Sequence, residues 1–142
     1  VHPLEGPRTV IGSAEEFARL RLSQVREEYE RAAQEPAPPE VWLEVIERYP
    51  ELRKWVAHNK TTSAEILQTL ATDEDPDVRS AVAMRRSCPP DARVSLSMDR
   101  DERVRATVAR NPKTSEELLR RMENDPSPFI RQLAADRLTS RR

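Results

Sequence analysis

The 142-residue sequence predicts an all-α fold, an α-solenoid of about four to five repeats in which each repeat is a pair of short helices. Three observations favour this class. Eight sequence positions recur with a period of 26 residues, helix-start signals recur in the same register, and no stretch of useful length alternates polar and apolar residues as a strand does. Both glycines lie within the first 12 residues, so no glycine interrupts the predicted repeats.

The period is clearest at four arginines spaced 26 residues apart: Arg53, Arg79, Arg105 and Arg131. An apolar residue precedes each arginine, and a Val-Ala or Ala-Ala pair follows three residues later. An aspartate recurs with the same period, at Asp73, Asp99 and Asp125. One arginine and one aspartate per repeat, beside a buried apolar stripe, favour a ladder of ion pairs and hydrogen bonds between repeats over an anion-binding site.

Capping residues predict where the two helices of each repeat begin. Asp75-Pro76 and Ser127-Pro128 join an N-cap residue to a proline at the first helical position, where the missing N–H costs nothing. The second helix is expected to begin at Thr62 or Thr114, because each has a glutamate three residues later and so forms a capping box. Cys88 occupies the same position in the repeat between them.

Towards the N-terminus the period weakens. Pro38-Pro39-Glu40 predicts the start of a helix with Trp42 in the core, and Ser13-Ala14-Glu15-Glu16 is a capping box. That box should open one amphipathic helix that caps the stack, with Phe17, Leu20, Val25 and Tyr29 on its apolar face. Residues 1–12 are expected to be an extended or mobile arm. Residues 13–142 would form a single helical-repeat domain, with repeat units near 28–52, 53–78, 79–104 and 105–138.

The string from Val104 to Leu119 reads Val-Arg-x-x-Val-Ala-x-Asn-Pro and then Glu-Leu-Leu, and it resembles the leucine-rich repeat variant family. The resemblance covers about residues 28–138. It implies short units in which an α-helix alternates with a 3₁₀-type helix, stacked as a right-handed superhelix similar to HEAT arrays. The third repeat departs from the pattern, because Arg85-Arg86-Ser87-Cys88 replaces the Asn-Pro turn. Some family members carry an iron–sulfur cluster on several cysteines; with Cys88 alone, no cofactor is expected here.

Composition argues against several classes of function. The chain has 24 basic and 25 acidic residues and a net charge of -1, unlike a protein that holds DNA by bulk charge. No apolar run approaches the roughly 20 residues of a membrane span and no signal-peptide pattern appears, so we expect no membrane partner and a cytoplasmic protein. Arginine outnumbers lysine 21 to 3, which fits a GC-rich bacterial genome.

Catalytic and metal-binding patterns are weak. His58 and Cys88 are the only residues that could form a thiol–imidazole pair, and no third group to orient them is evident. The aspartates of the acidic run at residues 73–77 are assigned to helix capping and to the ladder. We therefore expect neither an enzyme nor a metal site.

Candidate partner-binding residues lie at positions that differ between repeats. Trp55 is larger than its counterparts, so it is either a core filler or an exposed binding anchor. Basic residues in the turns after the first helices would form a stripe along one edge, since residues 1–52 carry a net charge of −5 and residues 53–142 one of +4. The predicted partner-binding residues are Lys54, Trp55, His58, Lys60, Met84, Arg85, Arg86, Arg110 and Lys113.

The sequence thus predicts a non-enzymatic module that binds another protein through a repeat-built surface, as a monomer or weak dimer. Two alternatives stay open. A nucleic-acid-binding HEAT-like solenoid would use the basic stripe as a phosphate track, although no aromatic residues interleave with it. An immunity or antitoxin-like protein would neutralise a basic toxin with the acidic residues Glu27, Glu28, Glu30, Glu35, Glu40, Glu44, Glu47 and Glu51.

Overall fold

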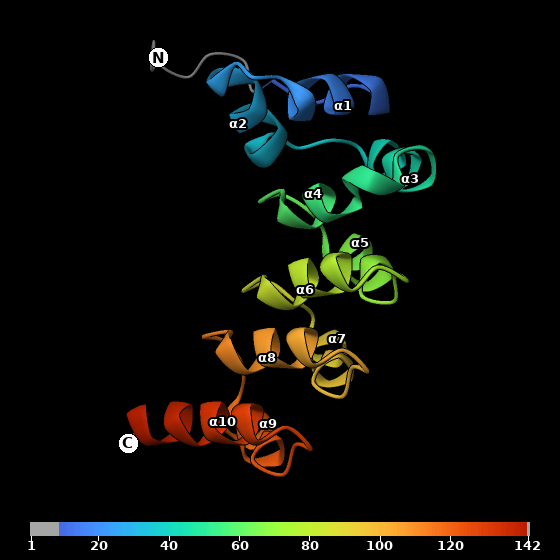
Figure 1. Cartoon of the computed structure of the whole chain (residues 1–142). Coiled ribbons are helices and arrows are strands. Elements are labelled where there is room, and N and C mark those ends of the chain that lie inside the picture. The colour runs from blue at the N-terminus through green and yellow to red at the C-terminus, as the bar shows by residue number, and fades with distance from the viewer. Residues whose placement is uncertain (1–8, 142) are drawn as a thin grey trace. The chain divides into compact units, whose positions relative to one another are not determined.

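A computed structural model describes residues 9–141 of the chain, which divides into an N-terminal unit, Val1–Ile66, and a C-terminal unit, Leu67–Arg142. Over residues 9–141 the chain forms ten α-helices and one 3₁₀ turn, with no strand (Figure 1). This confirms the prediction of an all-helical repeat protein. The handedness, the number of repeats and the single-domain organisation stay predictions.

The N-terminal unit contains α1 (Ala14–Leu22), α2 (Arg26–Gln34), α3 (Pro39–Arg48), the 3₁₀ turn η1 (Pro50–Leu52) and α4 (Arg53–His58). Its core lies where α1 meets α3, and there the rings of Phe17 and Trp42 pack edge to face with centroids 5.1 Å apart. Trp42 is therefore the core residue that was predicted. Most of the predicted N-terminal arm, residues 1–8, lies outside the described residues. Ile11 is buried and its N–H donates to the carbonyl of Pro36 at 2.9 Å.

The prediction of one amphipathic helix at the N-terminus is wrong, because two helices form there. Ser23 ends α1 in an extended conformation, and its Oγ accepts a hydrogen bond from the N–H of Val25 at 3.0 Å. Serine competes with the helical backbone by bonding to its own neighbours in this way. Val25 and Tyr29, expected on the buried face, are 50% and 39% exposed.

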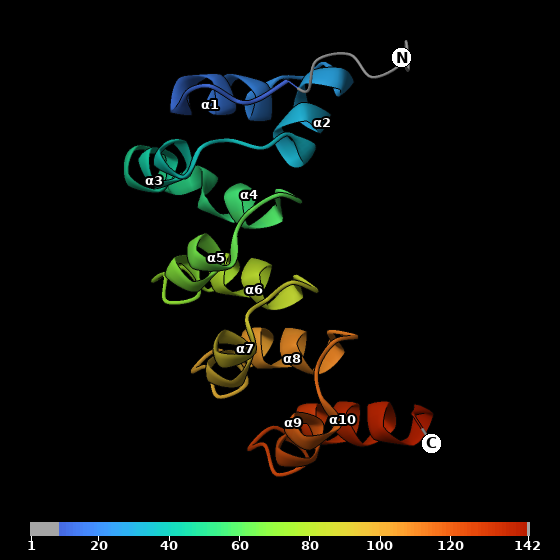
Figure 2. The same cartoon turned by 180° about the vertical axis from the view of Figure 1, so that it is seen from behind.

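The C-terminal unit contains α6 (Pro76–Met84), α7 (Pro90–Leu96), α8 (Glu102–Arg110), α9 (Glu116–Met122) and α10 (Pro128–Ser140), and α5 (Ala64–Leu70) runs across the division between the units. Figures 1 and 2 show α6, α8 and α10 side by side, with α7 and α9 in a second layer. The predicted apolar stripe of the first helices is buried, as Val78, Val82, Val104 and Val108 show.

The first helices of the repeats begin where the capping residues predict. The side chains of Asp75, Asp101 and Ser127 each accept a hydrogen bond from a backbone N–H in the first turn of α6, α8 and α10. The second helices differ from the pattern that the family resemblance implies, because α5, α7 and α9 are α-helical rather than 3₁₀-type. Each has seven residues, enough for bonds between residues four apart, such as Leu119 N–H to the carbonyl of Ser115 at 3.0 Å.

The predicted capping boxes of the second helices are wrong by one residue. Ser115, not Thr114, caps α9: its Oγ accepts a hydrogen bond from the backbone N–H three residues later at 3.1 Å. The Thr114 hydroxyl is buried and donates to the carbonyl of Val108, in the preceding first helix, at 2.6 Å. Thr62 and Ser63 repeat this arrangement. The buried hydroxyl needs an acceptor, and the Val108 carbonyl in the last turn of the preceding helix accepts it beside the N–H of Asn111.

We expect Ser115→Ala to lower the free energy of unfolding by about 1 kcal/mol, the usual effect of losing an N-cap. Ser95→Ala, which alters an exposed serine within α7, is the matched control and should change it by less than about 0.5 kcal/mol. Urea titration followed by circular dichroism measures both. Equal midpoints for the two variants would contradict the cap assignment.

Candidate functional site

Two of the repeating arginines in the C-terminal unit form the predicted internal ladder with aspartates, whereas the third, Arg131, donates to the backbone carbonyls of Asp125 and Pro126. Arg79 donates from Nε and Nη2 to the two carboxylate oxygens of Asp99, at 2.8 and 3.1 Å. Arg105 donates in the same way to Asp125, at 3.0 and 3.4 Å. Each guanidinium also donates to a carbonyl of the loop before its own helix, namely that of Asp73 or Asp99. These charges hold neighbouring repeats together, so they do not form a ligand site.

A second repeating position with a structural role was not recognised from the sequence. Asn111 is buried, and its Nδ2 donates to the carbonyls of Ala83 and Arg85 at 2.8 and 2.9 Å. Its Oδ1 accepts from the N–H of Lys113 at 2.8 Å. Asn59 makes the equivalent bonds in the N-terminal unit, to the carbonyls at residues 32 and 35. The side chain therefore ties each turn to the turn of the preceding repeat.

Arginine performs the same task at the last of these positions. Arg137 stands 26 residues after Asn111, and its Nη1 donates to the carbonyls of Ala109 and Asn111 at 2.8 and 3.4 Å. Burial lowers the pKa of the Arg137 guanidinium, and the two carbonyls compensate for the lost hydration. Because arginine can replace asparagine here, an arginine at the turn position does not by itself break the repeat.

Arg93 is a buried cation that the sequence did not reveal. The equivalent positions hold Leu67 and Leu119, both buried. The guanidinium of Arg93 donates to the carbonyls of Lys113, Arg86 and Cys88 at 3.0, 3.1 and 3.2 Å. These bonds bring the turn at residues 85–88 beside the turn at residues 111–114.

The predicted basic residues of the C-terminal unit therefore lie in two neighbouring turns. The side chains of Arg86, Arg110 and Lys113 are exposed, whereas Arg85 is half-buried and bonds to Ser87 Oγ at 3.4 Å. Met84, at the end of α6, is 57% exposed. The neighbouring turns agree with a stripe of positive charge within this unit, and its role in binding stays a prediction.

In the N-terminal unit, the predicted residue Trp55 lines a small cavity. Trp55 is half-buried, so its exposure is intermediate between that of a core filler and that of an exposed anchor, the two roles considered from the sequence. The cavity has a volume of about 180 Å³, and its lining residues are Arg21, Tyr29, Ala32, Ala33, Trp55 and His58. We call it the Trp55 pocket. The exposed Lys60 lies close by in the chain, and its N–H donates to the carbonyl of Ala33 at 2.9 Å.

Cations and rings meet at Trp55. The guanidinium carbon of Arg21 lies 3.5 Å from the centroid of the Trp55 ring, and Lys54 Nζ lies 5.3 Å from it. The ring of His58 is 5.5 Å away and tilted by 44°. Thus Lys54, Trp55 and His58 lie close together, and their role in binding stays a prediction. Arg21 was not among the predicted residues. Arg21 belongs to α1, where no repeat period exists to point to it.

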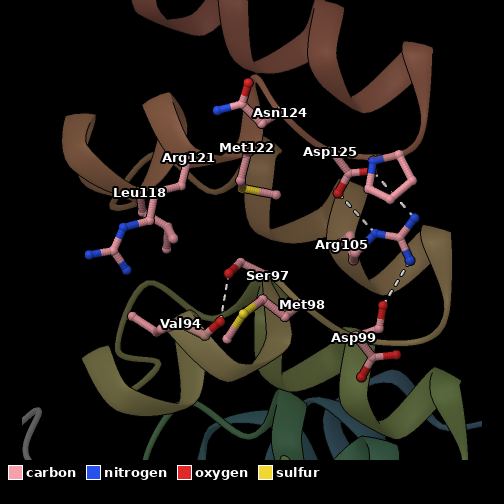
Figure 3. Close-up of a pocket in the computed structure, with 11 residues that line it drawn as sticks. Val94, Ser97, Met98, Asp99, Arg105, Leu118, Arg121, Met122, Asn124 and Asp125 are labelled. Carbon is pink, nitrogen blue, oxygen red and sulfur yellow. Dashed lines mark hydrogen bonds and ion pairs between the residues drawn. The ribbon is translucent and has the colours of Figure 1, made fainter.

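A larger cavity of about 390 Å³ lies between α7 and α9 in the C-terminal unit (Figure 3). Val94 and Met98 line it from one repeat, and Leu118 and Met122 from the next. Met98 is 73% exposed, whereas the equivalent residues in the other repeats, Thr72 and Asn124, are polar. No signal in the sequence pointed to this cavity. The carboxylates at its rim already bind ladder arginines: Asp125 pairs with Arg105, as Figure 3 shows, and Asp99 pairs with Arg79.

Cys88 is buried, and burial raises the pKa of its thiol. Its Sγ donates to the carbonyl of Pro89 at 3.6 Å. At a given pH the folded protein therefore holds less thiolate than an unfolded chain.

We expect iodoacetamide to alkylate native Cys88 at pH 7.5 at least about tenfold more slowly than it alkylates the chain in urea. Equal rates, read by mass spectrometry, would contradict the buried assignment.

The described residues contain no helix that is long and apolar enough to cross a membrane. Among residues 9–141 there is also no group of three histidine, cysteine, aspartate or glutamate side chains placed to hold a metal ion.

Comparison with family models finds two matches. The Leucine Rich Repeat Variant domain matches residues 27–86, and the Leucine rich repeat variant matches residues 102–127. No curated protein and no solved structure matches the chain. The two matched segments cover more than half of the chain, and they include the ladder residues Arg79, Arg105 and Asp125 and the turn residues Asn59 and Asn111. The chain therefore belongs to the leucine-rich repeat variant family.

Proposed function

We propose that this protein is a non-enzymatic interaction module that binds another protein through side chains at non-repeating positions. Repeat domains of this family generally mediate protein interactions or serve as scaffolds. In this protein the binding surface would consist of the side chains at non-repeating positions. The protein would act as a monomer or weak dimer, without a cofactor.

The observation that carries the proposal is a division between repeating and non-repeating side chains. The repeating residues, such as Arg105, Asp125 and Asn111, bond inside the C-terminal unit. Several large side chains at positions that differ between repeats are exposed instead: Met84 at 57%, Met98 at 73% and Phe129 at 52%. A frame fixed by its own hydrogen bonds can present such side chains with little loss of entropy on binding.

The position five residues after each repeating arginine shows the variation best. His58, Met84, Arg110 and Asp136 occupy it, and the last three are exposed. A second variable position, four residues earlier in each repeat, is less uniform. It holds Lys54, Ser80, Ala106 and Gln132, and Ala106 is buried. Differences in charge and shape at one exposed position are how a repeat scaffold selects a partner.

Two further observations favour a protein partner over the alternatives. In the C-terminal unit Arg93, Arg137 and Arg141 donate to backbone carbonyls, so these three cations serve the fold and do not extend the exposed stripe of Arg86, Arg110 and Lys113 into a longer phosphate track. Acidic residues expected to face a basic toxin are often paired. Of the eight glutamates named for that role, four form ion pairs inside the N-terminal unit. These pairs are Arg19–Glu28, Arg26–Glu30, Arg31–Glu35 and Arg48–Glu44.

Capture from the source lysate tests the proposal. Tagged protein is incubated with lysate, with and without nuclease, and bound proteins are identified by mass spectrometry. We expect a discrete protein that survives nuclease and is lost with Trp55→Ala or with charge reversal of Arg85, Arg86 and Arg110. Arg120→Glu, an exposed change on α9, is the control that should retain it.

The opposite results are equally informative. A signal that disappears with nuclease would replace the proposal with nucleic-acid binding. Capture of no protein, or capture that is indifferent to Trp55→Ala and to the charge reversals, would overturn the proposal as stated. Thermal melts of every variant confirm that a lost signal does not reflect unfolding.

A further inference from the structure

Arg21, in the last turn of α1, differs from the other arginines around it. Arg19, Arg26 and Arg31 each pair with a glutamate of the same unit, at 2.5, 2.8 and 2.8 Å. Arg21 forms no ion pair within residues 9–141, and its Nε is buried without a hydrogen-bond partner. Arg21 is thus a cation without a counter-charge among the described residues, and a carboxylate from outside the chain would be an acceptor for its N–H groups.

The contact with Trp55 fixes how Arg21 can receive such an acceptor. The guanidinium carbon lies 3.5 Å from the ring centroid, so the ring covers one face of the cation. The N–H donors of a guanidinium point outwards in its own plane, and two of them match the two oxygens of a carboxylate. A guanidinium held over a ring loses little freedom when it binds, which favours recognition of a carboxylate.

The rest of the Trp55 pocket has matching chemistry. His58 lines it and Lys54 Nζ lies 5.3 Å from the Trp55 ring, whereas no acidic residue is among its lining side chains in the described part of the chain. Ala32 and Ala33 form a small apolar wall. The volume of about 180 Å³ suits one side chain that is apolar along its stem and negative at its tip.

We propose that the Trp55 pocket receives a glutamate side chain from an acidic segment of the partner protein. The carboxylate accepts hydrogen bonds from Arg21, and the methylene groups pack against Trp55 and the two alanines. Lys54 Nζ, 5.3 Å from the centroid of the Trp55 ring, adds a second cation beside the pocket. This inference rests on the proposed function, because it names the kind of partner segment that the module binds.

Peptide binding tests the inference directly. The probe is a fluorescein-labelled decapeptide of alternating glutamate and alanine, and the comparison peptide has glutamine in place of every glutamate. We expect fluorescence anisotropy at low salt to show at least about tenfold weaker binding of the glutamine peptide. Arg21→Gln should weaken binding of the glutamate peptide by at least about tenfold, and Arg21→Lys should restore part of it, because lysine keeps the charge without the two-donor edge.

Arg26→Gln is the matched control. It removes the same charge from an exposed arginine on α2 that pairs with Glu30 outside the pocket, and it should change the affinity by less than about twofold. Thermal melts report whether each variant stays folded. Equal binding of the two peptides, equal effects of Arg21→Gln and Arg26→Gln, or no binding of the glutamate peptide at millimolar concentration would each overturn the inference.

Capture with Arg21→Gln separates this inference from the proposed function. If wild-type protein and the variant capture the same nuclease-resistant partner equally well, the proposed function stands and the carboxylate inference fails. If wild-type protein captures no protein, the proposed function fails whatever the peptide does. Self-association that depends on Arg21 in analytical ultracentrifugation would make a second copy of the chain the source of the glutamate, and would overturn the inference of a separate partner.

Discussion

Replacing Asp99 with asparagine is expected to lower the free energy of unfolding by about 3–5 kcal/mol, the usual effect of breaking a buried ion pair. Asp99 accepts two hydrogen bonds from Arg79 and a third from the N–H of Asp101 at 2.8 Å. The side chains of Arg79 and Asp99 are only 5% and 8% exposed. Asparagine preserves the shape of the aspartate but leaves the cation of Arg79 buried without a counter-charge.

Asp77→Asn provides the control for this prediction. Asp77 lies 3.9 Å from Arg103, and both side chains are mostly exposed, at 64% and 70%. Solvent screens such a pair, so the change should be within about 0.5 kcal/mol. Chemical denaturation followed by circular dichroism measures both variants. An Asp99→Asn effect no larger than that of Asp77→Asn would show that the ladder does not stabilise the repeats.

Replacing Asn111 with alanine is expected to lower the free energy of unfolding by about 2–4 kcal/mol. The change removes both donors to the carbonyls of Ala83 and Arg85 and the acceptor of the Lys113 N–H. Asn111 is only 3% exposed, so water does not readily replace these bonds. The magnitude reflects carbonyls and an N–H that are left without partners, rather than the net contribution of one hydrogen bond.

Two further variants separate the donors of Asn111 from its bulk. Asn111→Asp keeps the size and the acceptor but replaces the donor with a charged oxygen, so it should destabilise the protein at least as much as Asn111→Ala at pH 7. Asn124→Ala, which alters an exposed asparagine, should change the stability by less than about 0.5 kcal/mol. A loss below about 1 kcal/mol for both Asn111 variants would contradict the role of this side chain.

The repeat frame could be predicted because each of its parts leaves a periodic mark. A buried valine stripe, an arginine facing an aspartate and a proline after an N-cap must recur wherever one repeat packs on the next. Features decided by local competition leave no such mark. Ser23 ends α1 although apolar residues continue beyond it, and Thr114 bonds backwards to Val108 although its spacing to Glu117 fits a capping box.

The candidate site could be predicted only within single helices and turns. Lys54, Trp55 and His58 lie close together because they share α4, where His58 follows Trp55 by three residues and Lys54 by four. Arg21 comes from α1 and reaches Trp55 only after the N-terminal unit has folded, so no spacing in the sequence connects the two. Arg93 was missed for another reason: a cation at a leucine position is buried because the turns around it supply three carbonyls.

We propose that this protein works by binding another protein through its non-repeating surface residues. A calorimetric titration of the captured partner into wild-type protein and into Trp55→Ala tests it most directly, with nuclease present throughout. We predict saturable binding at a fixed ratio, weakened by about 30-fold in the variant, as for the loss of an aromatic anchor. Heat of binding that is absent in wild-type protein, or that is identical for wild-type protein, Trp55→Ala and the Arg85, Arg86 and Arg110 reversals, would contradict it.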